Sequence, residues 1–255
     1  MAVTALDRHP GGTETDAIRE ARIDLAAAFR WTARLGIHEG VANHFSLAVS
    51  DDGSRFLMNP KHRHFSRIRA SDLLLLDAND PDTMNRPDAP DPTAWCIHGA
   101  MHRANPNVRC LLHLHPKYAT ALACLKDPSM PPIDQNTARF HGRIAFDDGF
   151  GGMGLGDEAE RLANCLGNKS VLLMGNHGIM VTGSSVAQAF DELYYFEKSC
   201  ETLITALSTG RELNILSDDV AQKTCQEWLE YPGLWDNHLK EIRAILDDEE
   251  PDYRD

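Results

Sequence analysis

The chain contains 255 residues with a mass of 28.3 kDa, and its hydrophobic (42%) and charged (25%) fractions are ordinary for a globular protein. Its formal net charge of −13 argues against general binding to nucleic acid or to an anionic membrane, because both need basic surfaces. No apolar run approaches the roughly 20 residues that cross a bilayer, and the charged N-terminal region excludes a signal peptide, so we expect a cytoplasmic protein.

The first half of the chain alternates helical and strand-like segments. Residues 1–14 lack hydrophobic periodicity and predict a flexible arm. Apolar residues at helical spacing predict a helix over 15–35, with Gly36 as its C-terminal cap. The pattern then predicts three strands, over 45–49, 56–58 and 73–76. A loop rich in proline and aspartate follows over 79–92, and a second helix over 93–103.

The second half continues this alternation. The segment 128–156 is rich in Gly, Pro and Asp and is expected to be irregular. A stripe of apolar side chains predicts a long helix over 186–207, which Ser184 or Ser185 can cap. The remaining predictions are strand 108–114, helices 117–125 and 158–166, strands 171–174 and 179–181 around a turn, a helical pattern over 218–245, and an acidic disordered tail, 247–255.

Histidine is the residue type to examine for chemistry, because the chain contains twelve and imidazole is the commonest metal ligand in proteins. His113 and His115 close a predicted strand, and side chains two residues apart leave the same face of a strand. His177 stands in a tight turn between Gly175 and Gly178. The three imidazoles can form a metal site with a free coordination position, or they can be ordinary surface histidines.

Five motifs, taken with their order and spacing over residues 20–210, resemble the class II aldolase/adducin family of metal-dependent sugar-phosphate aldolases and epimerases. These motifs are Ala42-Asn43-His44-Phe45-Ser46, Ala70-Ser71-Asp72-Leu73, Ile97-His98-Gly99-Ala100-Met101-His102, Leu112-His113-Leu114-His115-Pro116 and Gly175-Asn176-His177-Gly178. The resemblance implies an α/β fold, an αβα sandwich around a mainly antiparallel central sheet, formed here by a single domain over residues 15–246. It also implies a homotetramer with its sites at subunit boundaries.

The resemblance also implies a divalent metal ion, Zn²⁺ before Mn²⁺, held by His113, His115 and His177. The aldolases of the family carry a catalytic glutamate where this chain has Ala94, and alanine cannot move a proton. We therefore assign no catalytic acid or base from the sequence, although Asp91 in the flanking loop, or a metal-bound hydroxide, can replace the missing base.

The phosphate-binding turns of the family's sugar-phosphate enzymes also differ here. The turn Gly-Asn-x-Ser becomes Asn43-His44-Phe45-Ser46, and a second turn, Thr-Gly, becomes Lys61-His62. The basic run 61–64 is either a solvated loop or a pocket for a carboxylate, so the expected partner is a small-molecule carboxylate substrate. The candidate substrate-binding residues are Asn43, His44, Lys61, His98, and, from the segment expected to approach the metal, Arg139 and His141.

The choice of reaction depends on where protons go. A metal ion that binds a hydroxy- or oxo-carboxylate polarises its carbonyl and stabilises a neighbouring enolate. Retro-aldol cleavage then needs a base, whereas decarboxylation needs an acid only after the bond has broken. With Ala94 in place of the glutamate, we expect a metal-dependent carbon–carbon lyase and prefer decarboxylation. Aldol cleavage of a non-phosphorylated substrate, epimerisation and a non-catalytic adducin-like scaffold remain the alternatives.

Overall fold

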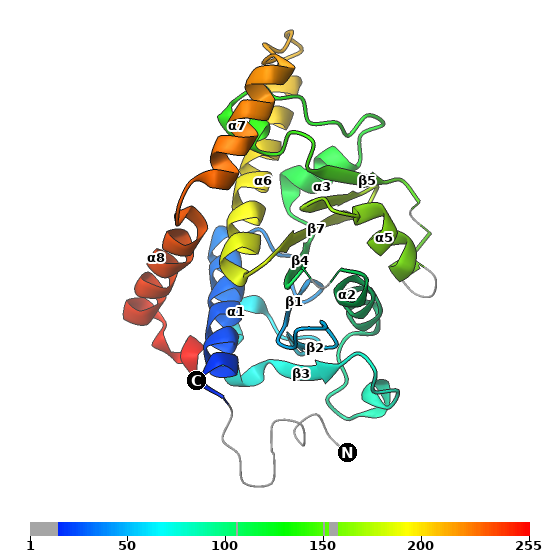
Figure 1. The fold of residues 1–255 in the computed structure, drawn as a ribbon, viewed down its shortest axis with the longest axis vertical. Coiled ribbons are helices and arrows are strands. Elements are labelled where there is room, and N and C mark those ends of the chain that lie inside the picture. Colours follow the sequence, from blue (N-terminus) through cyan, green and yellow to red (C-terminus); the bar gives the residue numbers. More distant parts are fainter. Residues whose placement is uncertain (1–14, 106, 150, 153–157) are drawn as a thin grey trace.

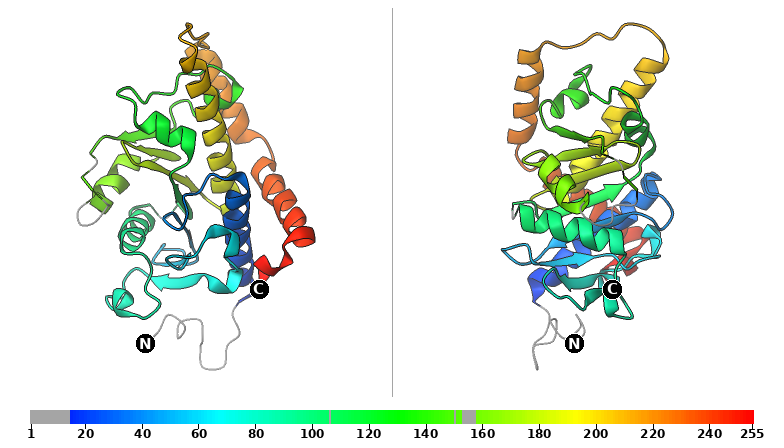
Figure 2. Two further views of the ribbon diagram at one scale, coloured as in Figure 1. Left: turned by 180° about the vertical axis from the view of Figure 1, so that it is seen from behind. Right: turned by 90° about the vertical axis from the view of Figure 1, so that its right-hand side faces the viewer.

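A computed structural model of the chain describes residues 15–105, 107–149, 151–152 and 158–255. The predicted flexible arm, residues 1–14, lies outside the described residues. A central sheet lies between two helical layers (Figures 1 and 2). The helices are α1 (Asp16–Leu35), α2 (Pro92–Ala104), α3 (Lys117–Ala123), α4 (Gln135–Arg139), α5 (Glu158–Leu166), α6 (Val186–Ser208), α7 (Asp218–Glu230) and α8 (Leu234–Glu249).

The sheet contains seven strands in the order β3-β2-β1-β4-β7-β6-β5. Every neighbouring pair is antiparallel except β5 and β6, which are parallel, so the predicted αβα sandwich around a mainly antiparallel sheet is confirmed. The strands are β1 (His44–Ala48), β2 (Arg55–Met58), β3 (Leu74–Asp77), β4 (Cys110–Leu114), β5 (Ile144–Asp147), β6 (Val171–Met174) and β7 (Gly178–Gly183).

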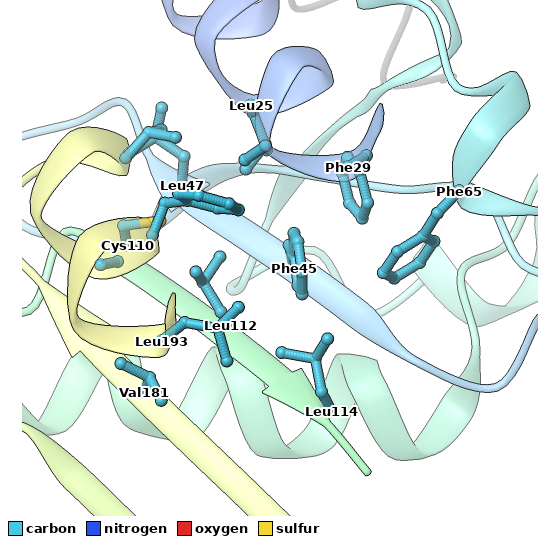
Figure 3. Close-up of a cluster of buried hydrophobic side chains, with 14 of the residues drawn as sticks. Leu25, Phe29, Phe45, Leu47, Phe65, Cys110, Leu112, Leu114, Val181 and Leu193 are labelled. Carbon is cyan, nitrogen blue, oxygen red and sulfur yellow. The ribbon is translucent and has the colours of Figure 1, made fainter. Parts of the chain in front are cut away.

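Alternation along the central strands divides the interior into two cores. Phe45 of β1 and Leu112 of β4 face the larger core, which α1, α3 and α6 cover (Figure 3). The Phe45 ring stacks on Phe29 of α1 at a centroid distance of 4.5 Å. Leu111 of β4 faces the smaller core on the other side, under α2 and α5. His44, Ser46 and His113 therefore project toward α2, because they alternate with these core positions.

Local capping agrees with the sequence at both long helices. Gly36 adopts the left-handed conformation (φ 66°) after α1, and its N–H bonds the carbonyl of Ala33. Ser185 is the residue that caps α6, and its hydroxyl accepts a hydrogen bond from the N–H of Gln188. None of the helices in the described ranges combines the length and apolar character that a membrane span requires.

Two segments differ from the predicted secondary structure: one contains regular elements where none was expected, and the other forms two helices in place of one continuous pattern. The stretch 128–156 contains the short helix α4 and strand β5, which is an edge strand added to the sheet in parallel with β6. The helical pattern over 218–245 is interrupted by Gly233 in the left-handed conformation (φ 69°), and it forms two helices, α7 and α8.

The prediction of a disordered acidic tail differs from the structure. Helix α8 continues to Glu249, and residues Pro251–Arg254 form a 3-10 turn that packs on α1. Tyr253 is fully buried there. Arg30 of α1 donates hydrogen bonds to Glu250 (3.1 Å) and to Asp252 (3.0 Å). The acidic residues are ordered because a buried guanidinium and an apolar anchor hold them, and composition alone does not reveal those partners.

Candidate metal centre

The end of β4 and the turn between β6 and β7 bring three imidazoles together. His113 lies on β4, His115 follows the strand directly, and His177 occupies the turn. One ligand atom of each ring lies within 4.8 Å of the others. The structure therefore assembles His113, His115 and His177 as the sequence predicts. Within the described ranges, no other group of three His, Cys, Asp or Glu side chains meets the same criterion.

The turn that presents His177 depends on its glycines. Asn176 has a positive φ of 56°, which fits a tight reversal between the paired strands. A Cβ atom on Gly178 would lie 2.5 Å from Cδ2 of His115 and 2.5 Å from the carbonyl oxygen of Leu114. Gly178 is therefore needed for close approach, because any side chain would displace a neighbouring imidazole.

Hydrogen bonds fix which nitrogen of each β4 histidine faces the cluster. The Nδ1 atom of His113 lies 2.9 Å from the carbonyl oxygen of Ile179, which can only accept, so Nδ1 carries the proton. The Nδ1 atom of His115 lies 2.5 Å from a carboxylate oxygen of Glu39 and is likewise a donor. Both Nε2 atoms of the neutral rings therefore present lone pairs, 3.1 Å apart.

This donor set fits a divalent cation. Two imidazole nitrogens bound to one tetrahedral zinc ion at about 2.0–2.1 Å would lie roughly 3.3 Å apart. Burial lowers the pKa of His113 well below its usual value, and the nearby His44 lowers it further. Burial also lowers the pKa of His177, to about 4. The rings of His113 and His177 are therefore neutral near pH 7, which is the form that binds metal.

A cavity of about 530 Å³ opens above the three imidazoles. Besides the histidine ligands, its wall includes His44, Asp91 and the exposed Val41, together with Ala42, His62, Thr93, Ile97, Gly152 and Asn176. A recess of about 20 Å³, enough for one water molecule, shares part of this wall. Asn43, Lys61 and Ala94 line the recess. The centre thus has both a ligand set and room for a small molecule.

Three of the predicted substrate-binding residues lie at this cavity or its recess. The His44 ring stacks on His113 at a centroid distance of 4.7 Å and faces both spaces. Asn43 is buried, and its side-chain NH₂ has no hydrogen-bond partner in the described part of the chain, although it lines the recess. Lys61 lines the recess as well. His98 lies one layer deeper, with its Nε2 atom 2.7 Å from Nδ1 of His44.

The other two predicted substrate-binding residues lie elsewhere. Arg139 is 1% exposed and forms an ion pair with the equally buried Asp191 of α6. Its guanidinium also stacks over Tyr195 at 4.7 Å. His141 pairs with Asp218 of α7 at 3.2 Å. In this chain neither side chain lines the cavity, because the part of the glycine-rich segment around α4 packs against α6 and α7, although Gly152 of the same segment does reach the cavity wall.

Two further carboxylates, Asp91 and Glu39, lie at the site; the sequence offers Asp91 as a replacement base, whereas none of the motifs includes Glu39. Asp91 caps α2, and one of its carboxylate oxygens accepts bonds from Thr93 and from the N–H of Ala94. Burial opposes ionisation of Asp91, but these hydrogen bonds lower its pKa, so the carboxylate is a weak proton acceptor. Glu39 lies 76 residues before His115, and the sequence carries no signal for that contact.

The chain belongs to the class II aldolase and adducin family: a model described as the class II aldolase and adducin N-terminal domain matches residues 23–204. The solved structure of an aldolase II superfamily protein from Pseudomonas syringae has 32% sequence identity and a TM-score of 0.85, covering 94% of this chain and 97% of that one. A Caulobacter vibrioides protein named "Putative aldolase class 2 protein" is 29% identical over 96% of this chain and 95% of its own. The decarboxylase NovR of Streptomyces niveus is 28% identical over 87% of this chain and 82% of its own.

Proposed function

We propose that this protein is a divalent-metal-dependent carbon–carbon lyase that acts on a small hydroxy- or oxo-carboxylate. The observation that carries the proposal is the convergence of His113, His115 and His177 beneath a cavity of about 530 Å³. These three residues would hold the metal ion, with zinc the first candidate and manganese the second. The ion would supply Lewis acidity that polarises a substrate carbonyl and favours the adjacent enolate.

The protein's own residues suit a carboxylate substrate better than a phosphate ester. Lys61 offers one cationic group at the recess, and the buried NH₂ of Asn43 points to an oxygen acceptor there. Of the remaining basic run, Arg63 pairs with Asp72 and His64 contacts His38. Since the recess shares part of the cavity wall, this cation and amide donor can bind one oxygen of a carboxylate whose remaining atoms occupy the cavity.

Two observations favour different reactions. Ala94 stands where the family's aldolases carry their glutamate, and it favours decarboxylation, since that cleavage requires no base. His44 favours the second candidate, retro-aldol cleavage, because it presents an unprotonated imidazole to the same cavity. The scaffold alternative gains no support from the site, since a scaffold has no need of three converging imidazoles.

We also propose a homotetramer whose active sites lie at subunit boundaries. Val41 supports this arrangement, because it is 45% exposed while it lines the cavity, and an apolar side chain at such a rim suits coverage by another chain. Light scattering on the purified protein should give four times the 28.3 kDa chain mass. A monomeric mass would contradict this assembly.

The function is tested by metal analysis followed by a substrate screen. The purified protein should contain about one divalent ion per chain, and His113→Ala should lose it. The zinc-loaded protein should then be offered small hydroxy- and oxo-acids, with carbon dioxide and aldehyde measured separately. Carbon dioxide alone would identify a decarboxylase, and aldehyde would identify an aldolase. A protein without stoichiometric metal, or one whose properties are unchanged by His113→Ala, would contradict the proposal.

A further inference from the structure

A line of hydrogen bonds runs from the cavity into the space between β1 and α2. Nδ1 of His44 lies 2.7 Å from Nε2 of His98, and Nδ1 of His98 lies 2.5 Å from the hydroxyl of Ser46. The same hydroxyl lies 2.8 Å from Nε2 of His102. Nδ1 of His102 ends the line, 3.1 Å from the carbonyl oxygen of Val108. We call these four side chains, from His44 to His102, the histidine relay.

The sequence explains why the relay forms. His44 and Ser46 alternate along β1 and therefore share the face that α2 covers. His98 and His102 are four residues apart on α2 and share the face that packs on the sheet. All four side chains are at most 5% exposed, so the relay is isolated from bulk water except at His44, which borders the cavity.

The carbonyl of Val108 determines the position of every proton in the relay. A carbonyl oxygen only accepts, so Nδ1 of His102 must carry a proton. In a neutral ring Nε2 of His102 is then an acceptor, and the hydroxyl of Ser46 donates to it. The Ser46 oxygen consequently accepts from Nδ1 of His98, which leaves Nε2 of His98 as an acceptor for the Nδ1 proton of His44.

The neutral state that this reasoning requires follows from burial. His98 and His102 are 0% exposed, and an imidazolium in such a place would lose its hydration. Burial lowers the pKa of His102 to about 4 and that of His98 well below its usual value. Positive charge is therefore excluded from the inner part of the relay near pH 7.

We propose that the relay holds His44 in the tautomer whose Nε2 lone pair faces the cavity, and that His44 is the catalytic base in place of the missing glutamate. This inference rests on the proposed lyase function. It narrows the substrate to a β-hydroxy carbonyl compound, in which the hydroxyl group is on the second carbon from the metal-polarised carbonyl. His44 touches the substrate, whereas Ser46, His98 and His102 are positioning residues that act through it.

The proton balance of the step is closed. Nε2 of His44 takes the hydroxyl proton of the substrate, the O–H electron pair forms a carbonyl, and the carbon–carbon bond breaks. The bond's electron pair becomes the enolate, and the new Nε2–H of His44 then returns its proton to the enolate carbon. Burial lowers the pKa of His44 to about 4, and the negative charge of Asp91, which lines the same cavity, offsets part of that effect.

Nuclear magnetic resonance of the metal-free protein tests the tautomer without any substrate. In ¹⁵N-labelled protein the ring of His44, assigned with His44→Asn, should show a protonated Nδ1 and an unprotonated Nε2. His102→Phe should abolish this single tautomer, because Ser46 is then free to donate to His98 and the proton of His44 can move to Nε2. The phenyl ring retains the contact that His102 makes with Phe56, whose ring centroid lies 5.1 Å away.

Ser46→Ala is a second variant that interrupts the relay, and it removes only one oxygen. Ser199→Ala is the matched control, because Ser199 is equally buried and its hydroxyl bonds a helix carbonyl outside the relay. A proton on Nε2 of His44 in the wild type, or an unchanged tautomer in both His102→Phe and Ser46→Ala, would overturn the proposal. Neither result depends on metal binding.

Proton exchange with hydroxypyruvate tests the catalytic role. In D₂O the zinc-loaded protein should exchange the carbon-bound C3 protons of hydroxypyruvate for deuterium. His44 would remove a C3 proton to form the enolate and would return a deuteron when the enolate reverts. His44→Asn should slow the exchange by roughly 10² or more. Ser46→Ala and His102→Phe should slow it roughly 3- to 10-fold, the worth of one hydrogen bond, and Ser199→Ala should not slow it.

The exchange result separates the two proposals. Exchange that persists at the wild-type rate in His44→Asn would refute the catalytic role of His44 and leave the lyase function intact. A chain that binds no zinc would refute the lyase function, while the tautomer measurement would still decide whether the relay orients His44.

Discussion

The Nε2 atoms of His113 and His115 lie 3.1 Å apart, and each ring has already committed its Nδ1 proton to another acceptor. When both rings are neutral, neither Nε2 atom carries a proton that it could donate, so the two lone pairs face each other. Such an arrangement is unfavourable in isolation and becomes favourable around a cation. The geometry of these two rings therefore suits a bound cation at this point.

Gly178→Ala should weaken metal binding without touching a ligand. The added Cβ would lie 2.5 Å from His115 Cδ2 and from the Leu114 carbonyl oxygen, so the ring must move. We expect zinc affinity to fall by roughly 10-fold or more, as happens when ligand orientation is disturbed. Competition with a chromophoric chelator measures the zinc affinity of each variant. Gly99→Ala on α2 is the control, because its Cβ would meet only the flexible end of Arg103, and equal affinities in the two variants would disprove the steric argument.

Glu39→Gln tests the orienting carboxylate. The neutral amide can still accept a hydrogen bond from Nδ1 of His115, but it no longer supports the positive charge that the ring acquires on binding a cation. We expect zinc affinity to fall by about 10- to 100-fold, with little change in the melting temperature of the metal-free protein. Glu160→Gln on the exposed surface of α5 serves as the comparison. Identical affinities for both variants would show that the contact is incidental.

The free energy of unfolding of the metal-free protein should fall as the pH falls from 6.5 to 4. The unfolded chain takes up a proton at His102 below pH 6.5, whereas the folded chain does not until about pH 4, because burial lowers the pKa. The unfolded state therefore binds more protons in this window, which lowers stability by about 1.4 kcal/mol per pH unit for this one group. Urea titrations should show a shallower pH slope in His102→Phe. Parallel slopes would contradict the neutral state assigned to this ring.

Tyr253→Ala should destabilise the fold although Tyr253 lies in the short 3-10 turn Pro251–Arg254. The ring is fully buried against the larger core, and its hydroxyl donates to Asp247 at 2.8 Å. We expect a loss of about 3 kcal/mol in the free energy of unfolding, the range for a buried aromatic cut to alanine. Tyr231→Ala provides the control, since that ring is 59% exposed. Similar losses of unfolding free energy in Tyr253→Ala and Tyr231→Ala would contradict an ordered C-terminal turn.

Arg139→Ala separates a structural from a substrate-binding role. Removal of the guanidinium leaves the buried Asp191 without its cation, and breaking such a pair costs about 3–5 kcal/mol. Metal content and hydroxypyruvate exchange should be unchanged in the fraction that folds. Denaturant unfolding and the hydroxypyruvate exchange rate should be measured on one preparation of the variant. Loss of exchange together with wild-type stability would indicate that Arg139 contacts the substrate.

Sequence patterns predicted those features that depend on local periodicity. Alternation along β4 placed His113 and His115 on one face, and glycine spacing placed His177 in a turn. The resemblance supplied the link between these distant motifs. Helical spacing also placed His98 and His102 on one face, although nothing in the sequence revealed that Ser46 joins them.

The structure differs from the sequence-based expectations where a residue's partner lies far along the chain. The sequence places Arg139 among the candidate substrate contacts, whereas in the structure Asp191, 52 residues later, pairs with it in the interior. The acidic C-terminal residues predicted disorder from their composition, yet Arg30 supplies the opposite charge. Composition and periodicity report only neighbours along the chain, so neither pattern can identify such a pair.

The contact between α1 and the last turn of the chain also has a consequence for biosynthesis. The carboxylate partners of Arg30 follow it by 220 and 222 residues, and the N–H of Ser71 donates to the carbonyl oxygen of Asp255. A ribosome therefore synthesises helix α1 long before it synthesises the residues that neutralise Arg30. Helix α1 can complete its native contacts only after those residues have also left the exit tunnel.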